Sequence, residues 1–335
     1  MTADAPVAAA DFAPPADLLD ALRSAGRVAL LGHVNPDADC LGSIGALALA
    51  LRELGKITHL SLPAGSVSRR LEFLAQIGGM RPSALVEITS CDVAVTLDTA
   101  RLRRVNVEGG AQALDGMLIA NVDHHATNEG FGRWNWVIPA ASSTCEMTLG
   151  LIEALGSGVT PTMATLLYAG LHSDTQGFSL ASTSPHSLLA GHRLALAGAE
   201  IHDVCERLHR SLARNEFELR QLVYTNPRVG AAGRLAWSSV SHEELLRTGC
   251  SASDVDDQVE IPRGVAGVRV AMLLTEGIPG RVRINFRGEG DTDVLSLAQQ
   301  FNGGGHRSSA GAQLSGPLPE VLERAGIRAE GQAGA

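Results

Sequence analysis

Short apolar runs alternate with helix-like patterns through the first half of the chain. The segments RVALLGH, ITHLSL, DVAVTLD and DGMLIANVDHH each contain several apolar residues and end in polar ones, a pattern typical of buried β-strands. The small and apolar residues from Cys40 to Leu54, which follow the first run, predict a helix. Strands that alternate with helices predict a parallel α/β sheet, in which ligands bind at the carboxyl ends of the strands. The polar residues stand at those ends, so we expect a ligand site there.

The pattern turns helical from about 143 to 217 and then changes again. The segments STCEMTLGLIEALG, TMATLLYAGLHSDT and SPHSLLAGHRLALAG are bounded by Gly, Ser or Pro, as helices commonly are, and a long polar helical stretch follows. After Pro227 come the strand-like pieces GRLAWSSV, GVRVAMLLTE and RVRINFRG, then the helix-like LSLAQQF and a glycine-rich run. We expect a disordered leader (1–15), a first α/β domain (16–200), a helical linker (201–225) and a smaller α/β domain (226–330).

Length and composition fit a compact two-domain protein. The 335 residues suffice for two domains of ordinary size, and the 45% apolar and 19% charged residues are close to average globular usage. The longest apolar run, around 41–51, is shorter than the roughly 18 to 20 residues that a membrane span needs. The N-terminal segment carries Asp4 and Asp11 where a signal peptide would be basic. We expect a cytoplasmic protein without a membrane partner.

The formal net charge of -9 narrows the class of substrate. Sequence-independent affinity for nucleic acid comes from Lys and Arg side chains that neutralise many phosphates. A chain this acidic would repel a long phosphodiester backbone. A small or short phosphorylated substrate, held at one local basic spot, fits the charge better.

Three potential metal ligands share one turn in GHVNPDADCLG. His33, Asp37 and Asp39 lie just beyond the first predicted strand, and Pro36 stiffens the turn that carries them. The pattern H-x-x-x-D-x-D is not specific by itself. Its alternative interpretation is a loop that exposes its charges to solvent, or that caps the next helix through Asp39.

Further acids and imidazoles follow at the ends of other predicted elements. Asp98 ends the strand DVAVTLD, Asp123, His124 and His125 end the strand in VDHHATN, and Asp174 stands where a helix gives way to a Gly-containing loop. Taken singly, Asp98 also fits a turn or helix cap, and Asp174 a helix terminus bonded to its own backbone. Taken together with the first turn, they predict a metal site. Carboxylates and imidazoles without thiolates favour Mn²⁺, Mg²⁺, Co²⁺ or Fe²⁺ over a structural zinc ion.

A second polar cluster is predicted near the C-terminus, in NGGGHRSSAGA. Consecutive glycines leave backbone N–H groups able to approach a phosphate, and we expect the residues after them to open a helix whose N-terminus favours anions. His306 and Arg307 add donors, and Arg287 in INFRG stands on a predicted strand before the run. A flexible hinge is the alternative for any glycine-rich segment.

The order of these motifs resembles that of the DHH phosphoesterase family: H-x-x-x-D-x-D, a strand-end Asp, D-H-H and a later Asp. The segment FNGGGHRSSAGA is similar to the G-G-G-H motif of the associated DHHA1 domain, so the resemblance covers nearly the whole chain after about residue 15. Within the family the chain is most similar to the branch of nano-RNases and pAp phosphatases. The resemblance implies an α/β fold, with a parallel-sheet DHH domain, flanking helices and a smaller α/β DHHA1 domain.

Carried over position by position, the resemblance implies a cage for two divalent cations, most simply Mn²⁺, with Mg²⁺ or Co²⁺ as alternatives. Two cations held close together lower the pKa of water and neutralise the charge that builds on phosphorus. The implied ligands are His33 and Asp37 for one cation, Asp39, His124 and Asp174 for the other, and Asp98 for both.

The resemblance also implies roles for residues around the cage. His125 would lie beside the scissile phosphate, where it donates to a phosphoryl oxygen or protonates the leaving group, and Asp123 would support a neighbouring histidine from behind. The implied catalytic residues are His125, Asp98 and Asp123. The residues implied to bind substrate are His125, Arg287, Gly303, Gly304, Gly305, His306, Arg307 and Ser309.

These implications predict a hydrolase that cleaves very short oligonucleotides, such as nanoRNA or pApA-like dinucleotides, into 5′-mononucleotides. Conversion of 3′-phosphoadenosine 5′-phosphate (pAp) to AMP is a second expected activity. Short RNA or DNA and nucleotides are the expected partners, and a homodimer is the family-level expectation. The alternatives are a RecJ-like exonuclease on longer single strands, which would need an added oligonucleotide-binding fold, a manganese pyrophosphatase with a Lys-rich C-terminal domain, and a nucleotide-binding regulator that lacks a metal ligand.

Overall fold

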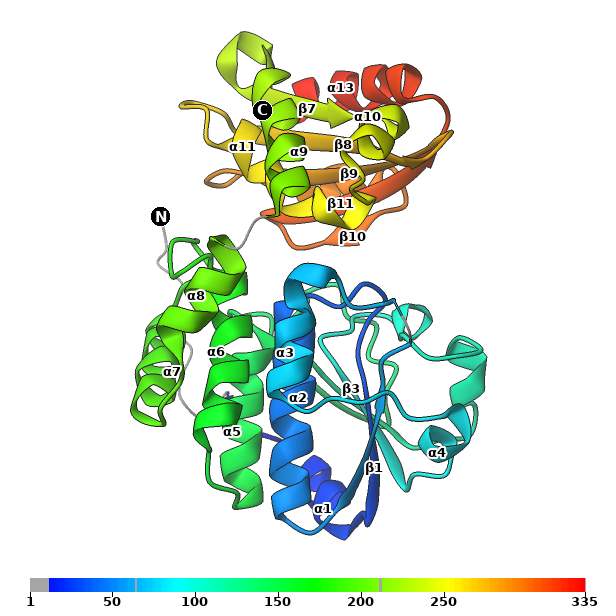
Figure 1. The fold of residues 1–335 in the computed structure, drawn as a ribbon, viewed down its shortest axis with the longest axis vertical. Helices are drawn as coiled ribbons and strands as arrows, with labels where there is room; N and C mark the ends of the chain where they lie inside the picture. The colour runs from blue at the N-terminus through cyan, green and yellow to red at the C-terminus, as the bar shows by residue number, and fades with distance from the viewer. Residues whose placement is uncertain (1–11, 64, 211–212, 335) are drawn as a thin grey trace. The chain divides into compact units, whose positions relative to one another are not determined.

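The computed structural model describes residues 12–63, 65–210 and 213–334 (Figure 1). The chain falls into two compact units, Met1–Ser211 and Leu212–Ala335. Most of the expected leader, 1–15, lies outside the described residues. None of the helices in the described ranges is long and apolar enough to cross a membrane.

The first unit contains the parallel sheet that the sequence predicts. Its strands are β1 (Arg27–Leu31), β2 (Ile57–Ser61), β3 (Val93–Leu97), β4 (Ile119–Asp123) and β5 (Trp134–Val137). Its helices are α1 (Ala16–Ser24), α2 (Ala38–Glu53), α3 (Glu72–Ile77), α4 (Leu85–Thr89), α5 (Thr144–Leu155), α6 (Pro161–Thr175), α7 (Pro185–Leu196) and α8 (Ile201–His209). The strand order is β2-β1-β3-β4-β5, and every neighbouring pair is parallel.

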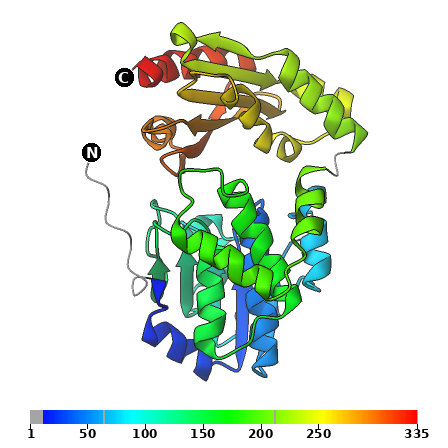
Figure 2. The ribbon, with the colours of Figure 1, turned by 90° about the vertical axis from the view of Figure 1, so that its left-hand side faces the viewer.

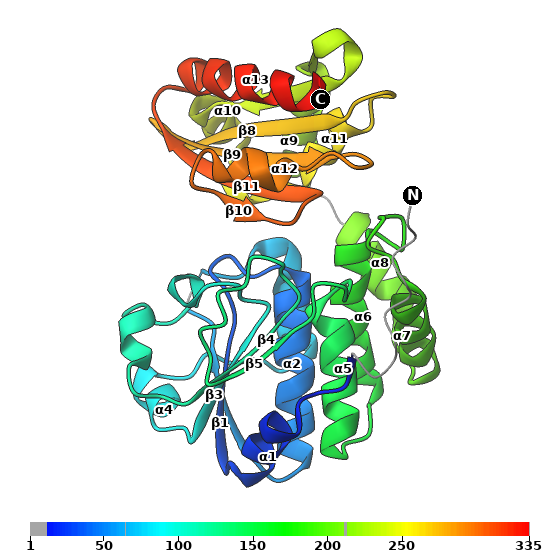
Figure 3. The same cartoon turned by 180° about the vertical axis from the view of Figure 1, so that it is seen from behind.

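Both faces of this sheet are buried, because alternate residues of a strand point to opposite faces. Val28 and Leu30 of β1 pack into the larger core, which α2, α5 and α6 complete. Ala29 and Leu31 pack into a smaller core on the other face, together with Ile88 of α4. Figure 3 shows α2, α5 and α6 to one side of the strands and α4 to the other, and in Figure 2 the green helices stand in front of the strands.

Helices α2 and α6 approach each other at glycines. A Cβ atom on Gly42 of α2 would lie 2.4 Å from the carbonyl oxygen of Leu166, and one on Gly170 of α6 would lie 2.8 Å from the Cα atom of Asp39. Neither position has room for a larger side chain. The first turn of α2, which carries Asp39, is therefore held directly against α6.

The second unit contains a mixed sheet. Its strands are β6 (Arg228–Gly230), β7 (Leu235–Val240), β8 (Val270–Ile278), β9 (Arg281–Gly288), β10 (Gly304–Gly305) and β11 (Ser309–Ser315). Its helices are α9 (Arg214–Thr225), α10 (His242–Thr248), α11 (Glu260–Arg263), α12 (Val294–Gln299) and α13 (Leu318–Gly334). The strand order is β10-β11-β9-β8-β7-β6, in which β7 and β8 are parallel and the other pairs antiparallel.

The predicted helical linker consists of two helices that belong to different units. Val204 and Leu208 of α8 are buried in the core of the first unit, whereas Leu219 and Val223 of α9 are buried in the second. The division between the units falls between these helices. The predicted domain limits at 200 and 226 lie on either side of it.

The prediction of a helix after the glycine run is wrong, because the residues that follow the run form the strand β11. Ala310, Ala312 and Leu314 are buried while the residues between them are more exposed, and this period of two fits a strand and not a helix. The glycines form the short strand β10 beside it. A Cβ atom on Gly303 would lie 2.2 Å from the carbonyl oxygen of Gly311, so the run provides close backbone approach within a hairpin.

Candidate metal centre

The predicted metal ligands of the first unit converge at one edge of its sheet. His33 follows β1, Asp98 follows β3 and His124 follows β4, and parallel strands end at the same edge. Asp37 and Asp39 stand at the start of α2, which begins at this edge. The structure thus brings together segments that are far apart in the sequence.

Asp98 lies between the two imidazoles. Its Oδ2 atom is 3.3 Å from Nε2 of His33, and its Oδ1 atom is 3.5 Å from Nε2 of His124. The carboxylate is almost completely buried, and the backbone of Asp98 has a φ of 54°, in the left-handed region that non-glycine residues seldom occupy. Such backbone strain is commonly retained at functional sites, and here it directs one carboxylate toward two histidines.

Asp37 completes the group around His33. Its Oδ2 atom is 3.7 Å from Nε2 of His33. Its Oδ1 atom accepts hydrogen bonds from the backbone N–H groups of Asp39 and Cys40, both at 3.0 Å. Asp37 therefore caps α2, and the interpretation in which Asp39 caps this helix is wrong.

Asp39 and Asp174 complete the group around His124. Their Oδ2 atoms are 3.9 Å and 3.3 Å from Nε2 of His124. Asp39 is fully buried, and its carboxylate accepts hydrogen bonds from the backbone N–H groups of Thr144, at 2.6 Å, and Cys145, at 2.8 Å. Those N–H groups belong to the first turn of α5, where the helix dipole favours a negative charge. The six side chains form two groups that share Asp98.

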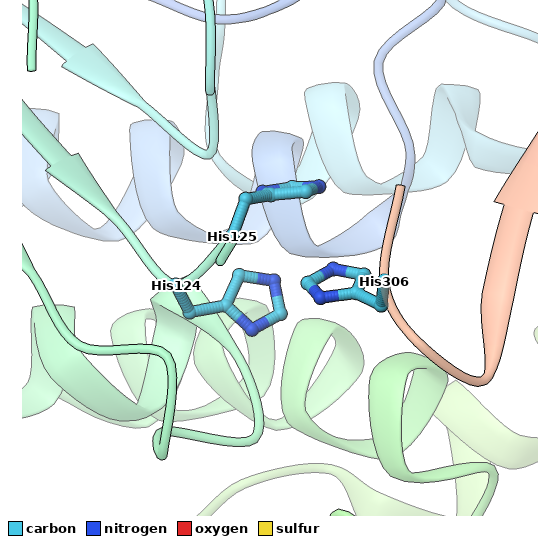
Figure 4. A group of neighbouring side chains, drawn as sticks. All are labelled: His124, His125 and His306. Atoms are coloured by element: carbon cyan, nitrogen blue, oxygen red, sulfur yellow. The ribbon is translucent and has the colours of Figure 1, made fainter. Parts of the chain in front are cut away.

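Both histidines turn the same ring atom toward the carboxylates. Nδ1 of His33 lies 2.9 Å from the carbonyl oxygen of Val34, and Nδ1 of His124 lies 3.3 Å from that of Ala141. A carbonyl oxygen only accepts, so each Nδ1 carries the proton and each Nε2 presents its lone pair in the neutral ring. This is the tautomer in which Nε2 can bind a metal while Nδ1–H is held by its acceptor. Figure 4 shows His124 and His125 at the end of β4; His306, also drawn there, belongs to the second unit.

The carboxylates crowd negative charge into a buried space. Burial and the charge of Asp98 raise the pKa of Asp39 to about 7, and burial with the charge of Asp39 raises that of Asp174 well above its ordinary value. Burial lowers the pKa of His33, but its hydrogen bonds to Asp37 and Asp98 outweigh this and raise it to about 10. Protons are thus held tightly among these groups, as expected where cations would otherwise balance the charge.

The donor atoms fit divalent cations. Their separations of 3.3 Å to 3.9 Å are near the roughly 3 Å between adjacent ligands of an octahedral ion with bonds of about 2.1 Å. Cys40 also lies near His33 and Asp98. However, burial and the charges of Asp98 and Asp37 raise the pKa of its thiol well above the ordinary value, which disfavours the thiolate that metals bind. The residues that could hold a metal are the carboxylates and imidazoles.

His125 lies beside this cluster and is held by Asp123. Its Nδ1 atom is 2.8 Å from Oδ1 of Asp123 and 3.6 Å from Oδ1 of Asp98. Oδ2 of Asp123 accepts a hydrogen bond of 2.6 Å from the amide of Asn128. Sequence reasoning missed Asn128, because an Asn in the segment ATNEG is typical of a turn.

The residues predicted to bind substrate lie in the second unit. Arg287 of β9 is paired with Ser309 of β11, and Gly304 of β10 with Gly311, so three neighbouring strands bring them together. The guanidinium of Arg307 donates to the carbonyl oxygen of Asp291 at 3.0 Å. The backbone N–H of His306 donates to the carbonyl oxygen of Ser309 at 2.6 Å and so closes the hairpin.

Arg287 has an acidic partner that the sequence did not reveal. Its Nε atom donates to Oε1 of Glu260 at 2.9 Å, and one terminal nitrogen donates to the carbonyl oxygen of Phe286 at 3.1 Å. The other oxygen of Glu260 accepts from Arg263 at 2.9 Å. The guanidinium of Arg287 is therefore fixed against the sheet by a carboxylate from α11, which no local pattern in the chain indicates.

Comparison with known proteins identifies the family. The N-terminal domain of the DHH family matches residues 27–171. A bifunctional oligoribonuclease and PAP phosphatase NrnA from Thermus thermophilus is 30% identical over 307 residues, which cover 89% of this chain and 88% of that protein. The chain belongs to the DHH family. The matched range contains all of the predicted ligands except Asp174, which lies three residues beyond it in α6.

Other relatives agree with this assignment. A bifunctional oligoribonuclease and PAP phosphatase NrnA from Bacillus subtilis is 26% identical over 285 residues, covering 84% of this chain and 87% of that one. Among solved structures, an exopolyphosphatase-related protein from Bacteroides fragilis superposes with a TM-score of 0.84 at 23% identity, over 98% of both chains. The fold of this DHH protein is therefore shared over the length of both units.

Proposed function

We propose that this DHH protein is a metal-dependent phosphoesterase that hydrolyses short oligonucleotides to 5′-mononucleotides. The observation that carries the proposal is the position of Asp98, with one carboxylate oxygen toward His33 and the other toward His124. A single carboxylate shared by two sets of ligands suits a pair of cations. The names of the relatives from Thermus thermophilus and Bacillus subtilis support oligonucleotides as the substrate class.

The proposed cofactor is a pair of divalent cations, with Mn²⁺ favoured and Mg²⁺ or Co²⁺ as alternatives. When bound, such cations act as Lewis acids and lower the pKa of water. The proposed ligands are His33 and Asp37 for one cation, Asp39, His124 and Asp174 for the other, and Asp98 for both.

The proposed catalytic residues of the chain itself act around this pair. His125 would donate a hydrogen bond to a phosphoryl oxygen, or a proton to the leaving group, from the ring nitrogen opposite the one that Asp123 holds. Asp123 would keep the ring in that orientation, as its 2.8 Å contact with Nδ1 supports. Asp98 takes part as the shared ligand.

Substrate binding is proposed for the polar residues on and between β9, β10 and β11 of the second unit, which resembles a DHHA1 domain. The guanidinium of Arg287 would bind a phosphate through its planar donors. The backbone of the glycine run would approach the same phosphate closely. The net charge of -9 favours a substrate with few phosphates over a long strand. The proposed residues are Arg287, Gly303, Gly304, Gly305, His306, Arg307 and Ser309.

Hydrolysis of pAp to AMP is a second proposed activity. It requires the same attack of water on phosphorus, with a phosphomonoester in place of a diester. The names of both NrnA relatives, which include PAP phosphatase, support it.

The function is tested by incubating the full chain with Mn²⁺ and, side by side, a labelled RNA dinucleotide, a labelled 24-mer and pAp. We expect rapid release of mononucleotides from the dinucleotide, AMP from pAp, slow action on the 24-mer and no turnover after chelation of the metal. Activity on the 24-mer alone would favour a RecJ-like exonuclease. Tight nucleotide binding without turnover of any substrate would favour a nucleotide-binding regulator.

A homodimer in the cytoplasm completes the proposal, and it rests on the family resemblance. Size-exclusion chromatography with light scattering on the full chain tests the dimer. A monomeric mass at micromolar concentration would contradict it.

A further inference from the structure

Asn128 is bonded to the residue that holds the proposed catalytic histidine. Its Nδ2 atom donates to Oδ2 of Asp123 at 2.6 Å and lies 2.7 Å from Oδ1 of Asn121. Its own Oδ1 accepts the backbone N–H of Gly130 at 2.7 Å, which fixes the orientation of the amide. The amide nitrogen therefore points inward, toward Asp123.

Asn121, which contacts Asn128, is itself hydrogen-bonded to residues at the end of the neighbouring strand. The Nδ2 atom of Asn121, in the middle of β4, donates to the hydroxyl of Thr96 at 2.9 Å and to the carbonyl oxygen of Thr99 at 3.0 Å. Asn121 and Thr96 are fully buried. With its Nδ2 engaged twice, Asn121 presents its oxygen to Asn128. Buried networks of this kind restrict their members to one arrangement.

Two carboxylates lie within reach of the same atom of His125. Nδ1 is 2.8 Å from Oδ1 of Asp123, and Oδ1 of Asp98 lies farther away, at 3.6 Å. Asp123 is fully buried, so its Oδ2 atom needs a donor, and leaving a buried acceptor unsatisfied is costly. Without the amide of Asn128, the carboxylate of Asp123 would rotate and His125 could turn toward Asp98.

We propose that Asn128 is a positioning residue that, by holding Asp123, fixes the orientation of the His125 ring. This contact keeps His125 from bonding to Asp98, whose oxygens then remain available to the metals. This inference rests on the proposed function, in which His125 acts on the substrate and Asp98 is a shared ligand. Asn128 itself need not touch the substrate. Its effect passes through Asp123 to the ring of His125.

The isosteric variant Asn128→Asp tests the proposal, because it replaces the donor with an acceptor that faces Asp123 and Asn121. With a dinucleotide substrate and saturating Mn²⁺, we expect kcat to fall by roughly tenfold or more while KM changes by less than about threefold. Asn128→Ser, which removes the amide without adding charge, should lower kcat in the same direction. Asn135→Asp is the matched control, because the exposed Asn135 amide bonds only with Gly132 among the described residues.

A double-mutant cycle separates positioning from a general structural role. In the background of His125→Ala, Asn128→Asp should cause little further loss of kcat, because its effect is transmitted through the missing ring. An undiminished additional loss in that background, or normal kcat in both Asn128 variants, would overturn the proposal.

A third readout needs no substrate. In histidine-labelled full-length protein loaded with diamagnetic Mg²⁺, the nitrogen and proton signals of His125 are identified by their absence in His125→Ala. We expect a hydrogen-bonded Nδ1–H in the unmodified chain, and a shifted or lost signal in Asn128→Asp and Asn128→Ser. Unchanged signals in both variants would refute the inference. Failure of the unmodified chain to hydrolyse any substrate would instead refute the proposed function.

Discussion

The Nε2 atom of His33 lies 3.3 Å from the Oδ2 atom of Asp98, where the neighbouring strands β1 and β3 end. The other oxygen of Asp98 is directed toward His124, so both oxygens of one carboxylate are committed to different imidazoles. An amide at this position would present only one oxygen, and a longer acid would place its two oxygens differently, so neither would present one carboxylate oxygen to each imidazole. The arrangement makes position 98 the sharpest test of a paired metal site.

Asp98→Asn should lower kcat by at least about a thousandfold at saturating Mn²⁺, because the proposed bridging ligand would lose its negative charge and metal charge stabilisation amounts to several kcal/mol. Metal analysis after gel filtration should find fewer ions per chain. Asp92→Asn is the matched control, since the exposed Asp92 bonds the backbone of Gly26 and Arg27 where β1 begins, away from the ligand edge. Near-normal rates in Asp98→Asn with metal present would contradict the paired site.

Metal binding should become tighter as pH rises. The pKa of His33 is raised to about 10 and that of Asp39 to about 7, so at pH 7 a cation must displace protons from its ligands. Raising the pH removes these competing protons and favours the cation. Calorimetric titration with Mn²⁺ in buffers of different ionisation enthalpy should detect net proton release at pH 7, and less of it at pH 9. Affinity that is independent of pH would argue against His33 as a ligand.

Arg287→Ala should raise KM for a dinucleotide by about ten- to hundredfold, the worth of a charged hydrogen bond, with kcat within about threefold. Steady-state kinetics at fixed Mn²⁺ measures both. Arg281→Ala provides the control, because Arg281 is an exposed residue at the start of the same strand. If both variants raised KM equally, loss of general positive charge would explain the result and a specific clamp at Arg287 would be wrong.

Gly170→Ala should impair both stability and metal binding. The new Cβ would lie 2.4 Å from Sγ of Cys145 and 2.8 Å from the Cα atom of Asp39, and overpacking of this kind costs about 1–3 kcal/mol. Because Asp39 is displaced, Mn²⁺ affinity should fall as well. Urea denaturation and metal titration measure the two effects.

Gly150→Ala is the matched control for Gly170→Ala, because it makes the same change within a helix but away from Asp39. On α5 its new Cβ would meet only the carbonyl oxygen of Phe12, at 4.0 Å, so better helix propensity should increase stability by about 0.5–1 kcal/mol with no effect on Mn²⁺ affinity. Destabilisation of both variants to the same extent would show that the contact with Asp39 does not decide the result.

Much of the fold follows from local patterns. The apolar runs that became β1 to β4 and the bounded segments that became α5 to α7 were predicted because a buried strand and a buried helix each impose a period on their own residues. The segment after the glycines was predicted incorrectly. Small residues such as Gly303 and Ala310 fit a helix start as well as a hairpin, and the pairing of β11 with β9 decided between them.

The sequence by itself determined the parallel sheet, the family motifs and the edge at which ligands gather, because these depend on residue type and short-range spacing. Only the tertiary structure decided which oxygen of Asp98 faces which histidine, that Thr144 and Cys145 bind Asp39, and that Glu260 holds Arg287. These contacts join residues far apart in the chain. Their geometry is set by how helices and strands pack together, which no local pattern of polar and apolar positions encodes.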